Sequence, residues 1–135
     1  ICGITGGVIA NAVTIFALCA AFRLSHVHYV TLLPKSITTA IGMGVSEEAG
    51  GIVTLTVVSI VITGISGSIL AETMFKLFHI GHPISRGLAL GTSAHAIGTA
   101  KALELGEIEG AMSSLSIAVA GLMTVLVVPL IANWI

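Results

Sequence analysis

S-R-G-L-A-L-G-T-S-A-H-A-I-G-T-A-K-A-L-E, residues 85–104, is the stretch that decides how this chain folds. It consists mainly of small residues, with a histidine at its middle and a basic residue near each end. The 14 residues between Arg86 and Lys101 are uncharged. As a helix they would rise about 21 Å, which is less than the roughly 30 Å of hydrocarbon in a bilayer. The stretch therefore predicts a short segment rather than a simple transmembrane helix.

Two stripes run along this segment when it is drawn as a helix with about 100° per residue. One stripe is polar and lies within about 60° on the wheel: Thr92, His95 and Thr99. The stripe beside it consists of glycines: Gly87, Gly91 and Gly98. This pairing is typical of a segment that packs closely against other helices and turns its polar groups away from lipid. We therefore expect close helix packing at the three glycines.

The composition indicates an integral membrane protein of the all-α class. Of the 135 residues, 56% are hydrophobic and only 8% are charged, whereas soluble domains carry roughly 25% charged residues. Aromatic residues make up 4% of the chain, which argues against the aromatic girdles of an outer-membrane barrel. The net charge of −1 and the lack of a basic cluster give no sign of nucleic-acid binding. We expect no cofactor and no metal site.

Three segments are long and apolar enough to cross a bilayer: residues 1–22, 52–71 and 111–134, the last with a kink expected at Pro129. Between them we expect a linker over 24–33, an amphipathic interfacial segment over 72–82 and a solvated acidic turn over 105–110. The chain begins inside an apolar run, so we expect it to be the C-terminal part of something longer. We treat residues 1–135 as a single membrane domain.

A second short segment, P-K-S-I-T-T-A-I-G-M-G-V, covers residues 34–45. Its proline and hydroxyl residues suit the first turn of a helix, where backbone N–H groups are free. Two interpretations remain open: a capped helix that begins at the membrane surface, or a broken, re-entrant helix that lines a site.

A weak internal repeat relates the two short segments. A full span, a linker with histidine, a short small-residue segment and a glutamate-glycine turn occur twice, and a third span closes the chain. If both short segments are re-entrant, the two units are inverted relative to each other and the short segments meet near the midplane, as in secondary transporters with discontinuous helices. If they cross the membrane, the units are parallel. We expect three full transmembrane helices and two short broken or re-entrant helices.

The polar residues of the two short segments are the candidate substrate ligands: Ser36, Thr38, Thr39, Thr92, Ser93, His95 and Thr99. His95 is the one ionisable group deep in an apolar stretch, which marks it as a functional candidate, although it could simply bond a neighbouring helix. Three basic residues could attract an anion by charge, and snorkelling to the surface explains them equally well: Lys35, Arg86 and Lys101.

Three ordered motifs give the chain a family resemblance. They are P-K-S-x-T-T at 34–39, R-G-L-A-x-G-T-x-x-H-x-x-G-T-A-[RK] at 86–101 and E-G-A-x-S-S-L at 109–115. With these motifs the chain resembles the C-terminal part of the LrgB/CidB family. Ala40 departs from the pattern, since the family often has proline there.

The resemblance implies a multi-pass protein of the bacterial cytoplasmic membrane or, alternatively, of the plastid inner envelope. Bacterial members are described as antiholin-like or holin-like proteins linked to murein hydrolase activity and cell lysis, and have been connected with pyruvate uptake. A plastid relative is described as a glycolate/glycerate transporter. The family also implies a homo-oligomer and an LrgA/CidA-type membrane partner.

Two functions therefore remain open at this point. The two short polar segments and the histidine favour a secondary transporter of small monocarboxylates. The alternative is an antiholin-like or holin-like regulator, for which the short segments are surplus. An enzyme is not expected, because the sequence has no nucleophile–base spacing, no H-E-x-x-H and no cofactor motif.

Overall fold

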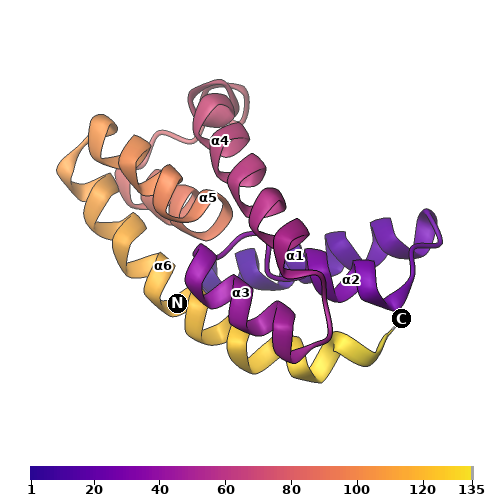
Figure 1. Cartoon of the computed structure of the whole chain (residues 1–135). Helices are drawn as coiled ribbons and strands as arrows, with labels where there is room; N and C mark the ends of the chain where they lie inside the picture. The colour runs from indigo at the N-terminus through magenta and orange to yellow at the C-terminus, as the bar shows by residue number, and fades with distance from the viewer. Residues whose placement is uncertain (135) are drawn as a thin grey trace.

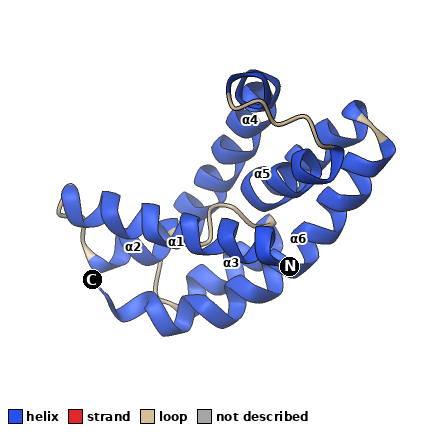
Figure 2. Cartoon of the chain, turned by 180° about the vertical axis from the view of Figure 1, so that it is seen from behind, coloured by secondary structure: helices blue, strands red, loops and turns tan. Residues whose placement is uncertain are grey.

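The computed structural model describes residues 1–134, and this part of the chain is helical with short connections (Figure 1, Figure 2). The helices in chain order are α1 (Cys2–Ala21), α2 (His26–Leu32), α3 (Thr39–Glu48), α4 (Val53–Leu77), α5 (Pro83–Leu105), α6 (Glu107–Ile131) and a final 3₁₀ turn η1 (Ala132–Trp134). The all-α prediction is confirmed.

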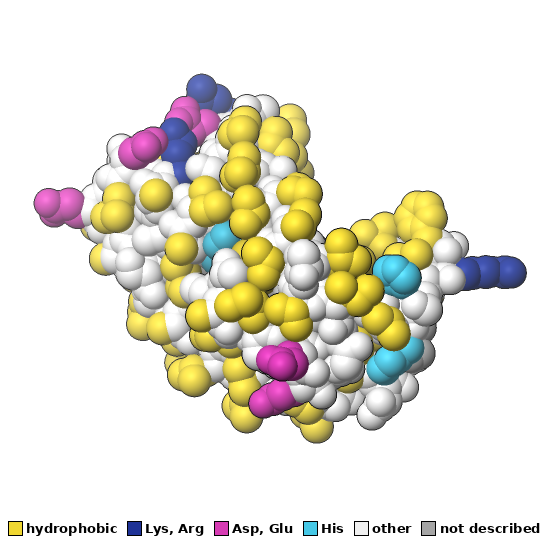
Figure 3. Space-filling view, viewed as in Figure 1, with side chains coloured by type: hydrophobic (Ala, Val, Ile, Leu, Met, Phe, Trp, Pro, Cys, Tyr) yellow, Lys and Arg dark blue, Asp and Glu magenta, His cyan; other side chains and the backbone are white. Residues whose placement is uncertain are grey.

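Three helices are long and apolar enough to cross a membrane: Cys2–Ala21, Val53–Leu77 and Glu107–Trp134. Large apolar side chains point outward from all three, as lipid-facing surfaces require. In Figure 3 such side chains cover α4, while charged side chains lie toward the margins of the view, apart from one acidic group in its lower middle. The three predicted spans are therefore confirmed, with α4 extending further than expected, to Leu77.

α5 is interrupted at His95, where φ is 42° and ψ is −135°. The second arm of α5 (residues 96–105) folds back on the first arm (residues 83–94). At Gly98 a Cβ would lie 2.5 Å from the Leu90 carbonyl oxygen and 2.7 Å from the Ala94 Cβ. α5 is therefore a hairpin with its tip at His95, and below we call it the α5 hairpin.

Both ends of the α5 hairpin lie at the same end of α4. Residues of α4 and of both arms line one small hollow there: Glu72, Phe75, Lys76, Arg86 and Leu105. The Lys101 Nζ also forms an ion pair with Glu72, at 2.7 Å. The tip reaches the middle of α4, since the His95 ring lies against Gly64 and bonds the carbonyl of Ile60. The α5 hairpin thus enters beside α4 and returns to its starting end.

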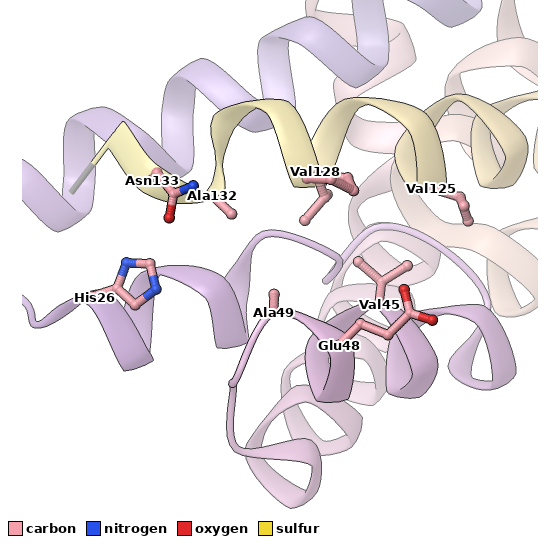
Figure 4. A pocket seen from close by; sticks show the side chains of 9 residues that line it. His26, Val45, Glu48, Ala49, Val125, Val128, Ala132 and Asn133 are labelled. Atoms are coloured by element: carbon pink, nitrogen blue, oxygen red, sulfur yellow. The ribbon is translucent and has the colours of Figure 1, made fainter.

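The connection over residues 33–38 joins α2 to α3, and the chain reverses direction there, with the two helices largely end to end (Figure 4). Below we call this unit the α2/α3 hairpin and the connection its tip. Three hydroxyl groups join the last turns of α2 and α3 to the start of α4. The Thr56 Oγ1 lies 2.7 Å from the Ser46 Oγ and 2.9 Å from the Thr31 carbonyl oxygen. The Ile52 N–H donates to the Thr31 Oγ1 at 2.8 Å. α2 and α3 are therefore fixed beside the first turns of α4.

The two hairpins approach the middle of α4 from its opposite ends. At Gly42, on α3 close to the first tip, a Cβ would meet the Ile60 side chain, and His95 at the second tip bonds the same residue's carbonyl. Figure 1 shows α4 running from α3 to α5, and α6 passing both. The tips of both short segments therefore lie beside the same part of α4.

Several expected boundaries were wrong. The linker over 24–33 contains α2, and the interfacial segment over 72–82 is mostly the last turns of α4. The connection between α5 and α6 is Gly106 alone, because α6 begins at Glu107. Glu109, which was expected in a solvated turn, is buried. The polar and glycine stripes predicted for residues 85–104 do not continue past His95, because the prediction assumed one continuous helix and the helix is interrupted there. α6 continues through Pro129.

Glycines of the first arm bring α5 into backbone contact with α6. A Cβ at Gly91 would collide with the carbonyl oxygen of Ser113 and the hydroxyl of Ser116, and one at Gly87 would collide with the carbonyl oxygen of Glu109. Small residues that let backbones approach are the usual basis of helix association in lipid.

We predict that Gly91→Ala destabilises the protein by about 2 kcal/mol, because the new methyl group overpacks a backbone contact that cannot yield. The measurement is the midpoint of SDS-induced unfolding in mixed micelles. Gly6→Ala on α1 is the matched control, since nothing lies within 4 Å of a Cβ there. Equal midpoints for the two variants would contradict the packing described here.

Candidate functional site

A groove of about 530 Å³ opens between α1, α4, the first arm of α5 and the tip of the α2/α3 hairpin. Eight polar side chains line it: Asn11, Thr14, Lys35, Ser36, Thr63, Ser66, Thr92 and Ser93. Four of these residues are among those selected from the sequence: Lys35, Ser36, Thr92 and Ser93. The structure thus brings parts of both short segments, which are more than 50 residues apart in the chain, to one groove.

Lys35 is the one charged side chain among the residues that line this groove. Its Nζ lies 3.3 Å from the Ser36 Oγ, to which it donates. An ammonium group without a carboxylate beside it favours an anion. The groove is therefore suited to a small negatively charged solute.

Asn11 of α1 holds the tip of the α2/α3 hairpin in place. Its Nδ2 donates to the carbonyl oxygen of Leu33 at 2.9 Å, and its Oδ1 accepts from the Ser36 hydroxyl at 3.1 Å. The Leu33 carbonyl lies where α2 ends, so it has lost the helical partner that a longer α2 would supply. Asn11 satisfies that group and positions Ser36 and Lys35 at the groove.

The two hydroxyls that the α5 hairpin contributes to the groove already donate hydrogen bonds within their own helix. The Thr92 Oγ1 donates to the carbonyl of Leu88 at 2.7 Å, and the Ser93 Oγ to that of Ala89 at 2.6 Å. Both protons are thus used within the helix, and a bound carboxylate would have to draw them away by rotation about χ1. Gly7 of α1 packs directly on Thr92, because a Cβ there would lie 3.1 Å from its Oγ1.

His95 and Thr99 lie outside the groove. The His95 side chain is buried, and its Nε2 lies 2.8 Å from the Ile60 carbonyl oxygen. Because a carbonyl only accepts, Nε2 carries a proton. The Thr99 Oγ1 lies 2.7 Å from the Ser113 Oγ of α6. Neither side chain reaches the groove in this conformation.

The remaining predicted residues lie elsewhere. Thr38 and Thr39 begin α3, half-buried, and do not line the groove. The Arg86 Nε donates to the Ile80 carbonyl at 2.8 Å, and its guanidinium lies 5.7 Å from the Phe75 ring centroid. Lys101 is hydrogen-bonded to Glu72 and, at 3.2 Å, to Glu104, which raises its pKa. Arg86 and Lys101 therefore bind other groups at the far end of α4.

Sequence reasoning missed half of the polar lining. Asn11 and Thr14 are the polar interruptions of the first span, a signal that the sequence did offer. Thr63 and Ser66 are three residues apart, so they share one face of α4. Their position among β-branched residues gave no hint of which helix they face.

A second hollow, of about 340 Å³, lies where the open end of the α2/α3 hairpin meets the C-terminal part of α6. Figure 4 shows His26 and Asn133 on opposite sides of one end of it, and Val45 and Val125 on opposite sides of the other end. None of the residues predicted from the sequence lines this hollow. It offers mixed polar and apolar walls but no cationic side chain.

Comparison with known proteins gives a consistent result. A match to the LrgB-like family covers residues 1–134. Antiholin-like protein LrgB of Bacillus cereus strain B4264 is 37% identical over 124 residues, which is 92% of this chain and 54% of that protein. The same values hold for the proteins of that name from Bacillus cereus strain AH187 and Bacillus anthracis strain A0248. The chain thus spans about half the length of these relatives. No solved structure matches it.

We predict that Asn11→Ala lowers the free energy of unfolding by about 1–3 kcal/mol, because a buried backbone carbonyl loses its donor and Ser36 loses its acceptor. The measurement is again the SDS unfolding midpoint. Thr14→Ala is the matched control on the same helix, since the Thr14 hydroxyl bonds only its own helix, at Ala10. Indistinguishable midpoints would mean that Asn11 does not hold the tip.

Proposed function

This chain belongs to the LrgB-like family, and from that premise we propose that it is a secondary transporter of small monocarboxylates such as pyruvate, glycolate or glycerate. It is a multi-pass membrane protein. The observation that carries the proposal is the groove in which Lys35 and hydroxyl groups from both short segments face one space. We place the protein in the bacterial cytoplasmic membrane.

In the proposed binding mode the carboxylate of the solute pairs with the Lys35 ammonium. A charged hydrogen bond of this kind is roughly twice as strong as a neutral one. Ser36 and Asn11 hold the lysine, and the hydroxyls of Thr63, Ser66 and Thr92 are within the same groove to bind the oxo or hydroxy group of a short acid. A groove of this size holds a three-carbon acid together with some of its water.

The arrangement of the hairpins supports alternating access. Transporters with inverted repeats bind their solute between discontinuous helices, and one unit rocks against the other. Here each unit contributes one tip to the groove. A rocking motion of one hairpin along α4 would open the groove to one side and close it to the other. The proposal involves binding and movement, without covalent chemistry.

The name of the curated relatives favours a second function. They are called antiholin-like proteins, and at 37% identity this chain could share that role, with an LrgA/CidA-type membrane partner and control of murein hydrolase activity. Such a regulator acts through self-association of apolar helices. It gives no reason for a cation to lie in a groove between two hairpin tips.

We predict saturable uptake of labelled pyruvate, glycolate or glycerate into proteoliposomes that contain the full chain, measured with and without a pH gradient. Lys35→Gln should reduce the uptake rate at low solute concentration by about tenfold or more, because the anion loses its charged partner. Lys101→Gln is the matched control, since that lysine pairs with Glu72 and neither residue lines the groove. Leakage of unrelated solutes, or no flux from detergent-stable oligomers, would favour the antiholin-like function.

A further inference from the structure

His95 occupies a backbone conformation that suits glycine. With φ at 42° and ψ at −135°, a residue that carries a Cβ is strained, whereas glycine adopts the region freely. The same hairpin has glycines nearby, at Gly91 and Gly98. At position 95 a glycine would adopt these backbone angles without strain. A histidine at this position indicates that its side chain offsets the strain.

The imidazole ring fits into α4. Its Nε2–H donates to the Ile60 carbonyl oxygen at 2.8 Å, and the side chain is 3% exposed. The ring lies against Gly64, where a Cβ would be 2.6 Å from the His95 Cε1 and 2.7 Å from its Nε2. The glycine on α4 thus makes the space that the ring fills.

We infer that His95 is a positioning residue that fastens the tip of the α5 hairpin to the middle of α4. It does not line the groove, but Thr92 and Ser93 precede it directly on the first arm and do line it. Loosening the tip therefore moves these two hydroxyls relative to Lys35. The part of this inference that is measured by uptake rests on the proposed transport. The contact between His95 and α4 does not depend on that proposal.

The contact between His95 and Ile60 needs a hydrogen-bond donor at the position of Nε2. It does not require the side chain at position 95 to gain or lose a proton. A glutamine places an amide donor at a similar reach, so His95→Gln should keep the contact with Ile60. His95→Gly relaxes the backbone and removes the ring. The two variants therefore separate the ring's role from the demand for a particular φ. Gly64→Ala tests the same contact from α4.

The test measures the tip directly, in full-chain protein in which Cys2 and Cys19 are replaced by alanine and Ser93 by cysteine. The rate at which a membrane-impermeant maleimide labels position 93 reports the placement of the first arm. We expect His95→Gly and Gly64→Ala each to change this rate by about tenfold, as the loss of a buried hydrogen bond implies. His95→Gln and the control Gly6→Ala should stay within about threefold of the parent protein.

Combining Gly64→Ala with His95→Gly should change the rate no more than either substitution alone, since both break one contact. The inference would be overturned if His95→Gly labelled at the rate of the parent protein. It would also be overturned if His95→Gln labelled at the same rate as His95→Gly. If His95→Gly does not fold, Gly64→Ala and His95→Gln still decide it.

Uptake by the same His95 and Gly64 variants, made in the chain that keeps Ser93, is the second readout. Uptake with the parent pH profile in His95→Gln, together with its loss in His95→Gly, is expected for a positioning residue. Loss of the pH dependence in His95→Gln would instead identify a proton relay and overturn the inference. Absence of uptake in the parent protein would refute the proposed transport and leave the labelling result valid.

Discussion

The structure depends on one constraint: inside a bilayer, each backbone N–H and C=O group needs a partner within the protein. The two hairpin tips violate the regular helical pattern, so their freed groups must be satisfied by side chains or local turns. The Leu33 carbonyl accepts from Asn11, while the N–H groups of Lys35 and Ile37 close turns on Leu32 and Pro34. Because these partners come from α1 and from the tip itself, the break over residues 33–38 is possible only where α1 lies beside it.

Small and hydroxyl-bearing residues then hold the short helices in position. An arm of 10 or 12 residues buries little apolar surface and cannot anchor itself in lipid as a full span does. In this protein glycine at Gly87 and Gly91 brings the first arm against α6, and the Thr99–Ser113 contact fixes the second arm to the same helix. Thr31, Ser46 and Thr56 do the same for the α2/α3 hairpin. The polar residues that make these segments poor spans are the ones that bind them to the long helices.

Length and charge spacing predicted the three spans and the two short segments, because both properties are local and the bilayer thickness is fixed. They also led to Lys35, Ser36, Thr92 and Ser93, which meet in one groove. The ion pair between Lys101 and Glu72 could not be predicted, because it depends on the second arm folding back beside α4. The break at His95 was hidden for a similar reason: the sequence there suits a helix, and the contact with Ile60 and Gly64 comes from α4.

If the groove binds a solute as proposed, its assembly from two hairpins would couple binding to movement in a way that a groove within one helix pair could not. Lys35 and Ser36 belong to the tip that Asn11 of α1 holds, whereas Thr92 and Ser93 belong to the first arm of the α5 hairpin, whose tip bonds α4. The first arm also packs against α1, at Gly7. A solute that contacts both tips gains binding energy only when the two units are at one particular separation. Its binding therefore favours that separation over others, by as much as the difference in affinity allows. In the proposed transporter, the same contacts that select the solute would also set how the two hairpins stand relative to each other.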